Sequence, residues 1–162
     1  MGASNAGAKV LLLERNSYRG GEATHIGIGA FRGFYSCGKS PERVVLGVWQ
    51  MALDKIERLG PVCDEIVSAT GNRNFNFHQE YLKCVLGDLI GKSGADCLLH
   101  SQVVAADVLD DRIVCISCED VEGLFTVKAS SFVDATGDAN LAHLCGAKTT
   151  WGATAAMSKL RL

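Results

Sequence analysis

Two short stretches of the sequence carry residues that could hold a nucleotide. In the first, "KVLLLERNSYRGGEAT" (9–24), an apolar run ends at Glu14, and Gly20 and Gly21 follow. A carboxylate at the carboxyl end of such a strand can accept hydrogen bonds from ribose hydroxyls, and glycine lets backbone N–H groups approach a pyrophosphate. The alternative is that the charge marks the point where the chain reaches water, and that the glycines form an ordinary tight turn.

The second stretch is "VDATGD" (133–138), in which a buried strand is predicted to end at Thr136 and Gly137. A glycine at this point leaves a side-chain-free approach for a ligand at the carboxyl end of the strand. That edge is where open α/β sheets bind their ligands. Asp138 has a structural alternative, because it can be the N-cap of the short helix expected from Asp138 to Cys145.

Two longer helices are predicted between these stretches. The first lies in "SPERVVLGVWQMALDKIERLGP" (40–61), where Ser40 can cap, Pro41 suits the first helical position, and Gly60 with Pro61 stops the helix. Its apolar stripe is Val45, Val48, Ala52, Ile56 and Leu59.

The second helix is expected from about His78 to Ser93 and ends at Gly94. Asn76 with Gln79 resembles a capping box at its start. Its core face is predicted to consist of Leu82, Val85, Leu86, Leu89 and Ile90.

The remaining elements predict an α/β fold. "ASNAGA" reads as the last turn of a helix that stops at Gly7, and Lys9–Leu13 as a parallel strand buried on both faces. The glycine-rich segment Asn16–Lys39 is expected to be a long ordered loop. An antiparallel meander is predicted from "DCLLHS", "VVAADVLD", "RIVCISCED" and "LFTVKAS".

Composition narrows the class of protein. The chain has 162 residues, of which 48% are hydrophobic, and its net charge of -2 provides no basic field for nucleic acid or an anionic membrane. No apolar stretch reaches the ~20 residues of a membrane span, and no signal peptide is recognisable. We therefore expect a cytoplasmic protein in a reducing compartment, with most of its seven cysteines serving as small hydrophobic residues of the core.

Other candidate sites are weaker. Cys115 and Cys118 have CxxC spacing, but positions three apart in a strand face opposite sides, and no second pair completes a metal site. We therefore predict no metal. His25, in the glycine-rich loop, is a candidate proton donor or substrate contact, although a lone loop histidine is more often simply solvated.

Four quoted stretches occur in an order that resembles one family. They are "GAKVLLLER…GGEAT", "GAFRGFY", "FNFHQEYLKCVLGDLIGKSGADCLLHSQVV" and "VDATGDANLAHLCGA". The chain resembles the FAD-dependent oxidoreductases with two dinucleotide-binding domains, from Gly7 to about Lys148. The resemblance implies an FAD/NAD(P)-binding, Rossmann-like fold with a parallel sheet, a β-meander and packed helices. It also implies FAD as cofactor and hydride transfer between a small-molecule substrate and the flavin.

The resemblance assigns roles to particular residues. Glu14 would hold the adenosine ribose, with Arg15 beside the adenine, and Gly20 and Gly21 would lie near the pyrophosphate. The backbone at the start of the meander would meet the adenine edge, and the "ATGD" element would close over the nucleotide. The residue that would meet the adenine edge is Val103 or Val104. The residues of the "ATGD" element that would close over the nucleotide are Thr136, Gly137 and Asp138.

The sequence also departs from the family pattern. The first strand and its GxGxxG turn have no counterpart, because Ser4 stands where "MGASNAG" would need a second glycine. We therefore expect an internal fragment or truncated reading frame, with a partial FAD-binding domain at 1–148 and a truncated tail at 149–162. The alternatives are a non-catalytic fragment, a subunit that needs a partner chain or self-association at its uncovered sheet edge, and a simple nucleotide-binding module.

Overall fold

The computed structural model describes residues 1–37, 40–59, 64–67 and 73–150. The chain is mixed α/β and divides into two compact units, Met1–His100 and Ser101–Leu162. It contains a parallel sheet, antiparallel sheets and helices, which confirms the predicted fold class. The predicted helix stop at 60–61 lies outside the described residues, as does most of the predicted tail.

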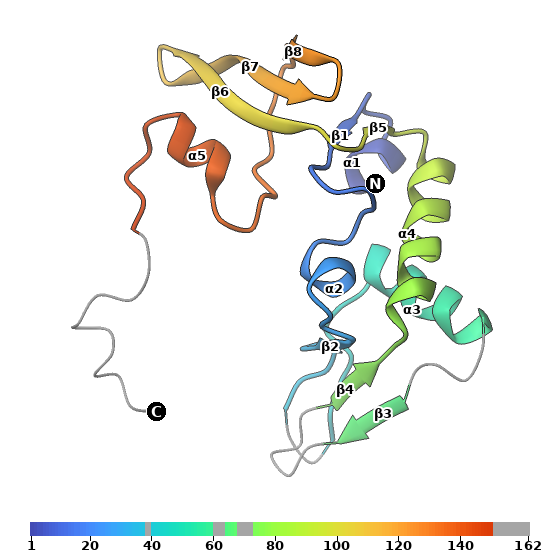
Figure 1. Cartoon of the computed structure of the whole chain (residues 1–162). Helices are drawn as coiled ribbons and strands as arrows, with labels where there is room; N and C mark the ends of the chain where they lie inside the picture. Colours follow the sequence, from blue (N-terminus) through green and yellow to red (C-terminus); the bar gives the residue numbers. More distant parts are fainter. Residues whose placement is uncertain (38–39, 60–63, 68–72, 151–162) are drawn as a thin grey trace. The chain divides into compact units, whose positions relative to one another are not determined.

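The first unit begins with a short helix and ends with a strand (Figure 1). In chain order it contains α1 (Gly2–Asn5), β1 (Leu11–Leu13), α2 (Glu22–His25), β2 (Ala30–Arg32), α3 (Val48–Leu59), β3 (Asp64–Val67), β4 (Arg73–Asn76), α4 (Gln79–Ser93) and β5 (Asp96–Leu98). The helix end predicted before Gly7 is confirmed by α1, and Gly7 has a positive φ of 90°.

Strands β1 and β5 form a parallel pair in which Leu12 lies opposite Cys97. The expectation that "DCLLHS" belongs to the meander is therefore wrong, because α4 returns the chain to the side of β1 before β5 begins. The parallel strand predicted at 9–13 is confirmed over its last three residues, which form β1. It is not buried on both faces, since Leu11 and, on β5, Leu98 are each 40% exposed.

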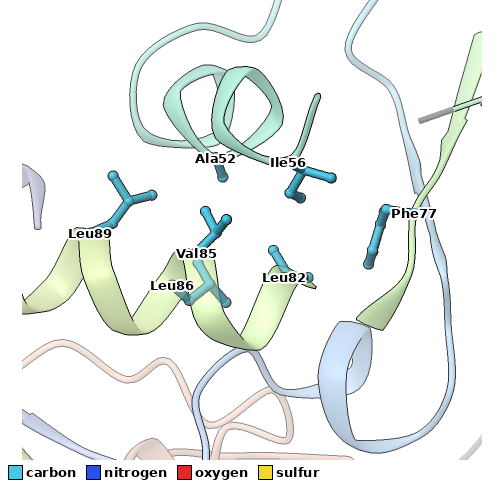
Figure 2. Packing of buried hydrophobic residues seen from close by; sticks show 7 residues of the cluster. All are labelled: Ala52, Ile56, Phe77, Leu82, Val85, Leu86 and Leu89. Atoms are coloured by element: carbon cyan, nitrogen blue, oxygen red, sulfur yellow. The ribbon is translucent and has the colours of Figure 1, made fainter. Parts of the chain in front are cut away.

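The core of the first unit lies between α3 and α4 (Figure 2). The predicted core face of α4 is confirmed, since all five of its residues are buried. Ala52 and Ile56 of α3 meet this face, and Phe77, two residues before α4, completes the cluster. An ion pair of 2.7 Å between Lys55 and Asp88 joins the same two helices at the surface.

The ends of α4 show which predicted signals the structure uses. His78 is the N-cap, and its side chain accepts a hydrogen bond of 3.3 Å from the amide of Glu80. The predicted cap, Asn76, is instead the last residue of β4 and pairs with Ala30 of β2. Gly94 closes the helix in the left-handed conformation, with φ of 73°, as predicted.

The start of α3 was predicted too early. The helix begins at Val48, and Gly47, with φ of 79°, precedes it. The segment before Gly47 is extended, because Arg43 forms a bridge with Tyr35 and the amide of Val44 donates to the carbonyl of Phe34 at 2.8 Å. Ser40 and Pro41 therefore neither cap nor begin a helix.

The glycine-rich segment 16–39 is more regular than a loop. It contains α2 and β2, and β2 pairs antiparallel with β4, which in turn pairs with β3. Phe31 of β2 stacks near Phe77, with 4.3 Å between the ring centroids. These aromatic contacts attach the segment to the α3–α4 core.

The second unit is an antiparallel meander followed by a short helix (Figure 1). Its elements are β6 (Gln102–Leu109), β7 (Arg112–Asp120), β8 (Gly123–Val127) and α5 (Asn140–Leu144). These three strands confirm the predicted meander. The buried strand predicted before "ATGD" is not formed, since residues 128–138 have no strand pairing and Val133 is 86% exposed.

Candidate functional site

Glu14 follows β1 directly, at the carboxyl end of the parallel pair. Its amide donates to the carbonyl of Leu98 at 2.9 Å, which continues the β1–β5 ladder. One carboxylate oxygen, Oε1, accepts from the backbone amide of Asn16 at 2.8 Å and from its side-chain amide at 2.9 Å. The other oxygen, Oε2, has no hydrogen-bond partner among the described residues. Glu14 is therefore held in place with one acceptor left for a ligand.

The two predicted phosphate-binding glycines have different surroundings. A Cβ atom on Gly20 would lie 2.6 Å from the Thr24 side chain and 2.8 Å from Cδ1 of Leu86. A Cβ atom on Gly21 would meet nothing within 4 Å, and its φ of 53° with ψ of -129° suits glycine. Packing therefore explains the glycine at position 20, whereas the main chain of Gly21 borders open space.

His25 is the last residue of α2 and is exposed. Its Nδ1 lies 3.2 Å from the hydroxyl of Tyr18. The ammonium of Lys83, on α4, lies 3.9 Å from the centroid of the Tyr18 ring, and it is also paired with Glu80 at 2.7 Å. The hydrogen bond to Glu80 raises the pKa of Lys83, so this cation remains protonated.

Val103 and Val104 lie at the start of β6, in the second unit. Val103 is half-buried opposite Cys118 of β7, and the register then passes directly to Ala105 opposite Ser117. Val104 is therefore the extra residue of a β-bulge, a position that leaves backbone groups outside the ladder.

The "ATGD" element forms a turn held by Asp134, a residue that the sequence interpretation did not single out. Asp134 accepts from the amide and the hydroxyl of Thr136, at 3.0 and 2.7 Å, and from the amide of Ala142 at 2.9 Å. The Thr136 hydroxyl accepts from the amide of Asn140 at 2.9 Å. These hydrogen bonds, that of the Thr136 hydroxyl first, lower the pKa of Asp134.

Asp138 is not the helix cap that the sequence indicated. The N-cap of α5 is Ala139, with φ of 57°, and the orphan amides of the first turn are satisfied by Thr136 and Asp134. The Asp138 side chain has no hydrogen bond among the described residues. Gly137 has φ of 84°, and a Cβ atom at this position would meet nothing within 4 Å.

The predicted cofactor residues thus form two sets, one in each unit. In the first unit, Glu14 and the exposed Arg15 follow β1, and the same loop leads to the glycine pair and His25. In the second unit, the bulge of β6 and the turn before α5 carry the other set, and α5 packs against β6. Each set therefore lies within a single unit.

The CxxC pair occupies two different environments on β7. The Cys115 thiol donates to a carboxylate oxygen of Asp107 at 2.9 Å, and this hydrogen bond raises the pKa of the thiol. Cys118 is fully buried, and its burial raises the pKa of its thiol. Neither thiol is activated as a thiolate. Cys118 is the only buried cysteine among the described residues, so the expectation that most cysteines belong to the core is wrong.

Three side chains with clear roles were missed in the sequence. Asn16 orients Glu14, Lys83 lies over Tyr18, and Asp134 builds the turn before α5. An asparagine two residues after an acid, and an Asp-x-Thr before a short helix, are local signals that could have indicated two of them. Lys83 carries no such signal, because its partner is 65 positions away in the chain.

A family model described as FAD dependent oxidoreductase matches residues 1–159. No curated protein matches the chain. Among the described residues, no helix has the length and apolar character needed to cross a membrane.

Solved structures similar to the chain include THI4 of Thermovibrio ammonificans, with a TM-score of 0.52 and 15% identity. The match covers 90% of this chain and 56% of that one, so the chain spans about half the length of THI4. A flavoprotein/dehydrogenase from Cytophaga hutchinsonii has a TM-score of 0.48 and 15% identity, covering 94% of this chain and 39% of that one. Aklavinone-11 hydroxylase, in a ternary complex with FAD and aklavinone, has a TM-score of 0.38 and 15% identity, covering 78% and 28%.

The likeness to THI4 indicates a shared fold, and the family match extends over nearly the whole sequence. The chain belongs to the FAD-dependent oxidoreductase family.

Proposed function

We propose that this chain contributes the FAD-binding part of an oxidoreductase that transfers a hydride between a small-molecule substrate and the flavin. The observation that carries the proposal is the position of Glu14. Its carboxylate ends a strand of a parallel pair, is fixed by Asn16, and keeps one oxygen without a partner among the described residues. An acid at this position of a dinucleotide-binding fold accepts hydrogen bonds from ribose hydroxyls.

The remaining predicted contacts are proposed on the same basis. Arg15 is exposed next to Glu14 and would lie beside the adenine. The bulge at Val104 leaves backbone groups outside the ladder, as a contact with the adenine edge requires, and Val103 precedes it. We further propose that residues 1–148 act as one FAD-binding domain.

The phosphate contacts divide between the two glycine-containing turns. Gly21 is proposed to approach the pyrophosphate through its main chain, because its surroundings are open, while Gly20 supports it by fitting against Leu86. Thr136, Gly137 and Asp138 are proposed to close over the nucleotide. Of these, the Asp138 carboxylate has no internal partner among the described residues, whereas Thr136 is engaged by Asp134.

Bound FAD would supply the redox chemistry, because its isoalloxazine ring accepts or donates a hydride. The chain would bind the adenosine half through Glu14 and hold the phosphates against the turn at Gly21. His25 is the proposed contact to the substrate, since it lies four residues beyond Gly21 and is exposed.

The experiment is a titration of FAD into the purified chain and its Glu14→Gln variant, followed by flavin fluorescence. Glutamine can still accept from Asn16 but replaces the second acceptor oxygen with a donor group. Loss of a hydrogen bond to a charged group costs about 1.5–3 kcal/mol, so the Kd for FAD should rise by about 10- to 100-fold.

Glu22→Gln is the matched control, because it removes an exposed carboxylate from the neighbouring helix α2. It should leave the Kd for FAD unchanged. Equal affinities for the wild-type chain and Glu14→Gln would overturn the ribose assignment. Failure of the wild-type chain to bind FAD would exclude an FAD site made by these residues without a partner.

A second proposal follows from the exposure of the parallel pair. Parallel strands are normally part of a larger, covered sheet, yet Leu11 and Leu98 are each 40% exposed. Among the described strands β1 pairs with β5 alone, which leaves the other edge of β1 unpaired. A partner strand, from another chain or from a second copy, would cover this edge and complete the cofactor site. Light scattering distinguishes the two possibilities, because only self-association raises the mass of the purified chain with concentration.

We also propose a cytoplasmic location. Cys84, Cys97, Cys115, Cys118 and Cys145 are free thiols, as expected in a reducing compartment. Thiol titration of protein isolated under non-reducing conditions checks this, and oxidised pairs among these five would contradict it.

A further inference from the structure

Tyr18, His25 and Lys83 form a contiguous group at the end of α2. The Tyr18 hydroxyl lies 3.2 Å from Nδ1 of His25, and the two ring centroids are 5.9 Å apart. Lys83 covers the face of the Tyr18 ring, with Nζ 3.9 Å from the centroid. The Lys83 ammonium also forms an ion pair with the Glu80 carboxylate at 2.7 Å. Glu80 therefore restrains Lys83, Lys83 restrains the Tyr18 ring, and the Tyr18 hydroxyl restrains the imidazole of His25.

The position of Lys83 favours one direction for the hydrogen bond between Tyr18 and His25. A phenol can donate or accept, and a neutral imidazole does either according to its tautomer. A cation on the ring face attracts the π electrons, which makes the phenolic oxygen a poorer acceptor and its proton a better donor. The position of Lys83 therefore favours the Tyr18 hydroxyl as the donor and Nδ1 of His25 as the acceptor.

We propose that Tyr18 and Lys83 are positioning residues that hold His25 as the Nε2–H tautomer, so that its Nε2 proton is presented to a carbonyl oxygen of the substrate. When Nδ1 accepts, the proton of the neutral ring resides on Nε2. Nε2 has no partner among the described residues, and His25 is exposed. This inference rests on the proposed function, which supplies the substrate.

The chemistry of the group favours a carbonyl over a phosphate. The charge of Lys83 is already balanced by Glu80, so a neutral N–H donor is what the group offers to a ligand. Such a donor binds a carbonyl oxygen without requiring an anion, and it can stabilise negative charge that develops there when hydride is transferred to the carbonyl carbon.

The backbone beneath His25 is held firmly enough for such a role. Its amide donates to the carbonyl of Gly21 at 2.8 Å. The preceding residue, Thr24, is 2% exposed, and its hydroxyl donates to the carbonyl of Arg19 at 2.8 Å. Ala23 packs against the α3–α4 core. The imidazole is therefore attached to a supported turn of helix.

The test is long-range ¹H–¹⁵N NMR of the full chain without FAD, at a pH where the imidazoles are neutral. His25 should be the Nε2–H tautomer in the wild-type chain. Tyr18→Phe keeps the ring under Lys83 and removes only the hydroxyl. The loss of one exposed hydrogen bond should shift the tautomer ratio toward Nδ1–H by about two- to tenfold.

His78 is an internal reference, because its Nδ1 accepts from the backbone amide of Glu80 and does not involve Tyr18. Its signals should be unchanged in Tyr18→Phe. Tyr81→Phe is the matched control variant, since the Tyr81 ring lies beside His78 rather than His25. It should leave the tautomer ratio of His25 as in the wild type.

Lys83→Gln provides a second variant that leaves Tyr18 intact. It should shift the ratio in the same direction as Tyr18→Phe and by a smaller factor. A wild-type His25 with its proton on Nδ1, or a ratio that neither variant changes, would overturn the proposal. Because this measurement needs no FAD, a failed FAD titration with the expected tautomer result would discard the proposed function and leave the positioning of His25 intact.

Discussion

The two segments proposed to hold the cofactor, 11–25 and 133–138, are held by different kinds of contact. The first is attached to a hydrophobic core, because Ala23 packs on the α3–α4 cluster and Gly20 fits against Leu86. The second is exposed and is held by hydrogen bonds from Asp134 and Thr136. Burial supports the first segment, whereas a local polar network supports the second.

The same comparison explains why one predicted strand formed and the other did not. A buried strand was predicted at the start of both segments, but only β1 has a neighbour among the described strands, β5, with which it pairs in register. The residues before Asp134 have no neighbouring strand among the described residues, and Val133 is left 86% exposed. An apolar run becomes a strand only where a partner supplies the ladder hydrogen bonds. Its sequence alone does not provide that partner.

The largest expected effect is on the core that supports the first segment. Leu82 is fully buried between α3 and α4, so Leu82→Ala leaves a cavity and should reduce the free energy of unfolding of the first unit by about 2–5 kcal/mol. Urea unfolding followed by the methyl resonances of Leu86 and Leu89 measures this change.

Cys84→Ala is the control, because it truncates an exposed side chain on the same helix. It should change the free energy of unfolding by no more than about 0.5 kcal/mol. If Leu82→Ala were as mild as Cys84→Ala, the first segment would not depend on a packed core, and the comparison between the segments would fail.

A smaller effect separates the two adjacent glycines of the first segment. Both have positive φ, so Gly20→Ala and Gly21→Ala share a backbone cost. Gly20→Ala adds an overlap with Thr24 and Leu86, which should make it more destabilising than Gly21→Ala by about 1–3 kcal/mol. The same urea titration measures the difference.

When FAD binding is compared at equal folded fraction, Gly21→Ala should weaken it more than Gly20→Ala. Gly21→Ala places a methyl group in the open space where the pyrophosphate is proposed to lie, whereas the methyl group of Gly20→Ala is directed into the protein. Equal stability of the two variants would contradict the packing role of Gly20. A stronger loss of FAD binding in Gly20→Ala than in Gly21→Ala would contradict the proposal that Gly21, rather than Gly20, approaches the pyrophosphate.

Helix α4 could be predicted from the sequence because its signals are local. The apolar spacing on one face and the glycine at position 94 lie within a few turns of each other, and both are confirmed. The start of α3 carried equally good local signals in Ser40 and Pro41. The predicted start was wrong because residues 43 and 44 pair with Tyr35 and Phe34, and no local sequence pattern indicates these contacts.

The candidate site was predicted to a similar extent. The position of Glu14 followed from the strand before it, and the structure places it at the end of β1. The short helix after "ATGD" was predicted and is confirmed by α5, but its cap was assigned to Asp138 because a single acid before a helix is the simplest pattern. Asp134 lies farther from the helix and reaches it only through the geometry of the intervening turn.

The smallest expected effect tests the polar network of the second segment by pH. Because the folded pKa of Asp134 is lowered, its contribution is present above the ordinary pKa of aspartate and is lost as pH falls through the folded value. The amide resonances of Thr136 and Ala142 should therefore titrate together, below the range of a free aspartate. ¹H–¹⁵N spectra recorded during acidification follow this step.

Replacing the acids then distinguishes Asp134, which accepts from an amide of the first turn of α5, from the predicted cap Asp138. Asp134→Ala removes the acceptor of Thr136 and Ala142 and should destabilise α5 by about 1 kcal/mol, the usual cost of losing a helix cap. The helical Cα chemical shifts of residues 140–144 would move toward unfolded values. Asp138→Ala should leave those shifts unchanged, because its side chain has no hydrogen bond among the described residues. If Asp138→Ala changed these shifts and Asp134→Ala did not, Asp138 would be the cap of α5. Its carboxylate would then not be available for the nucleotide, contrary to the proposal.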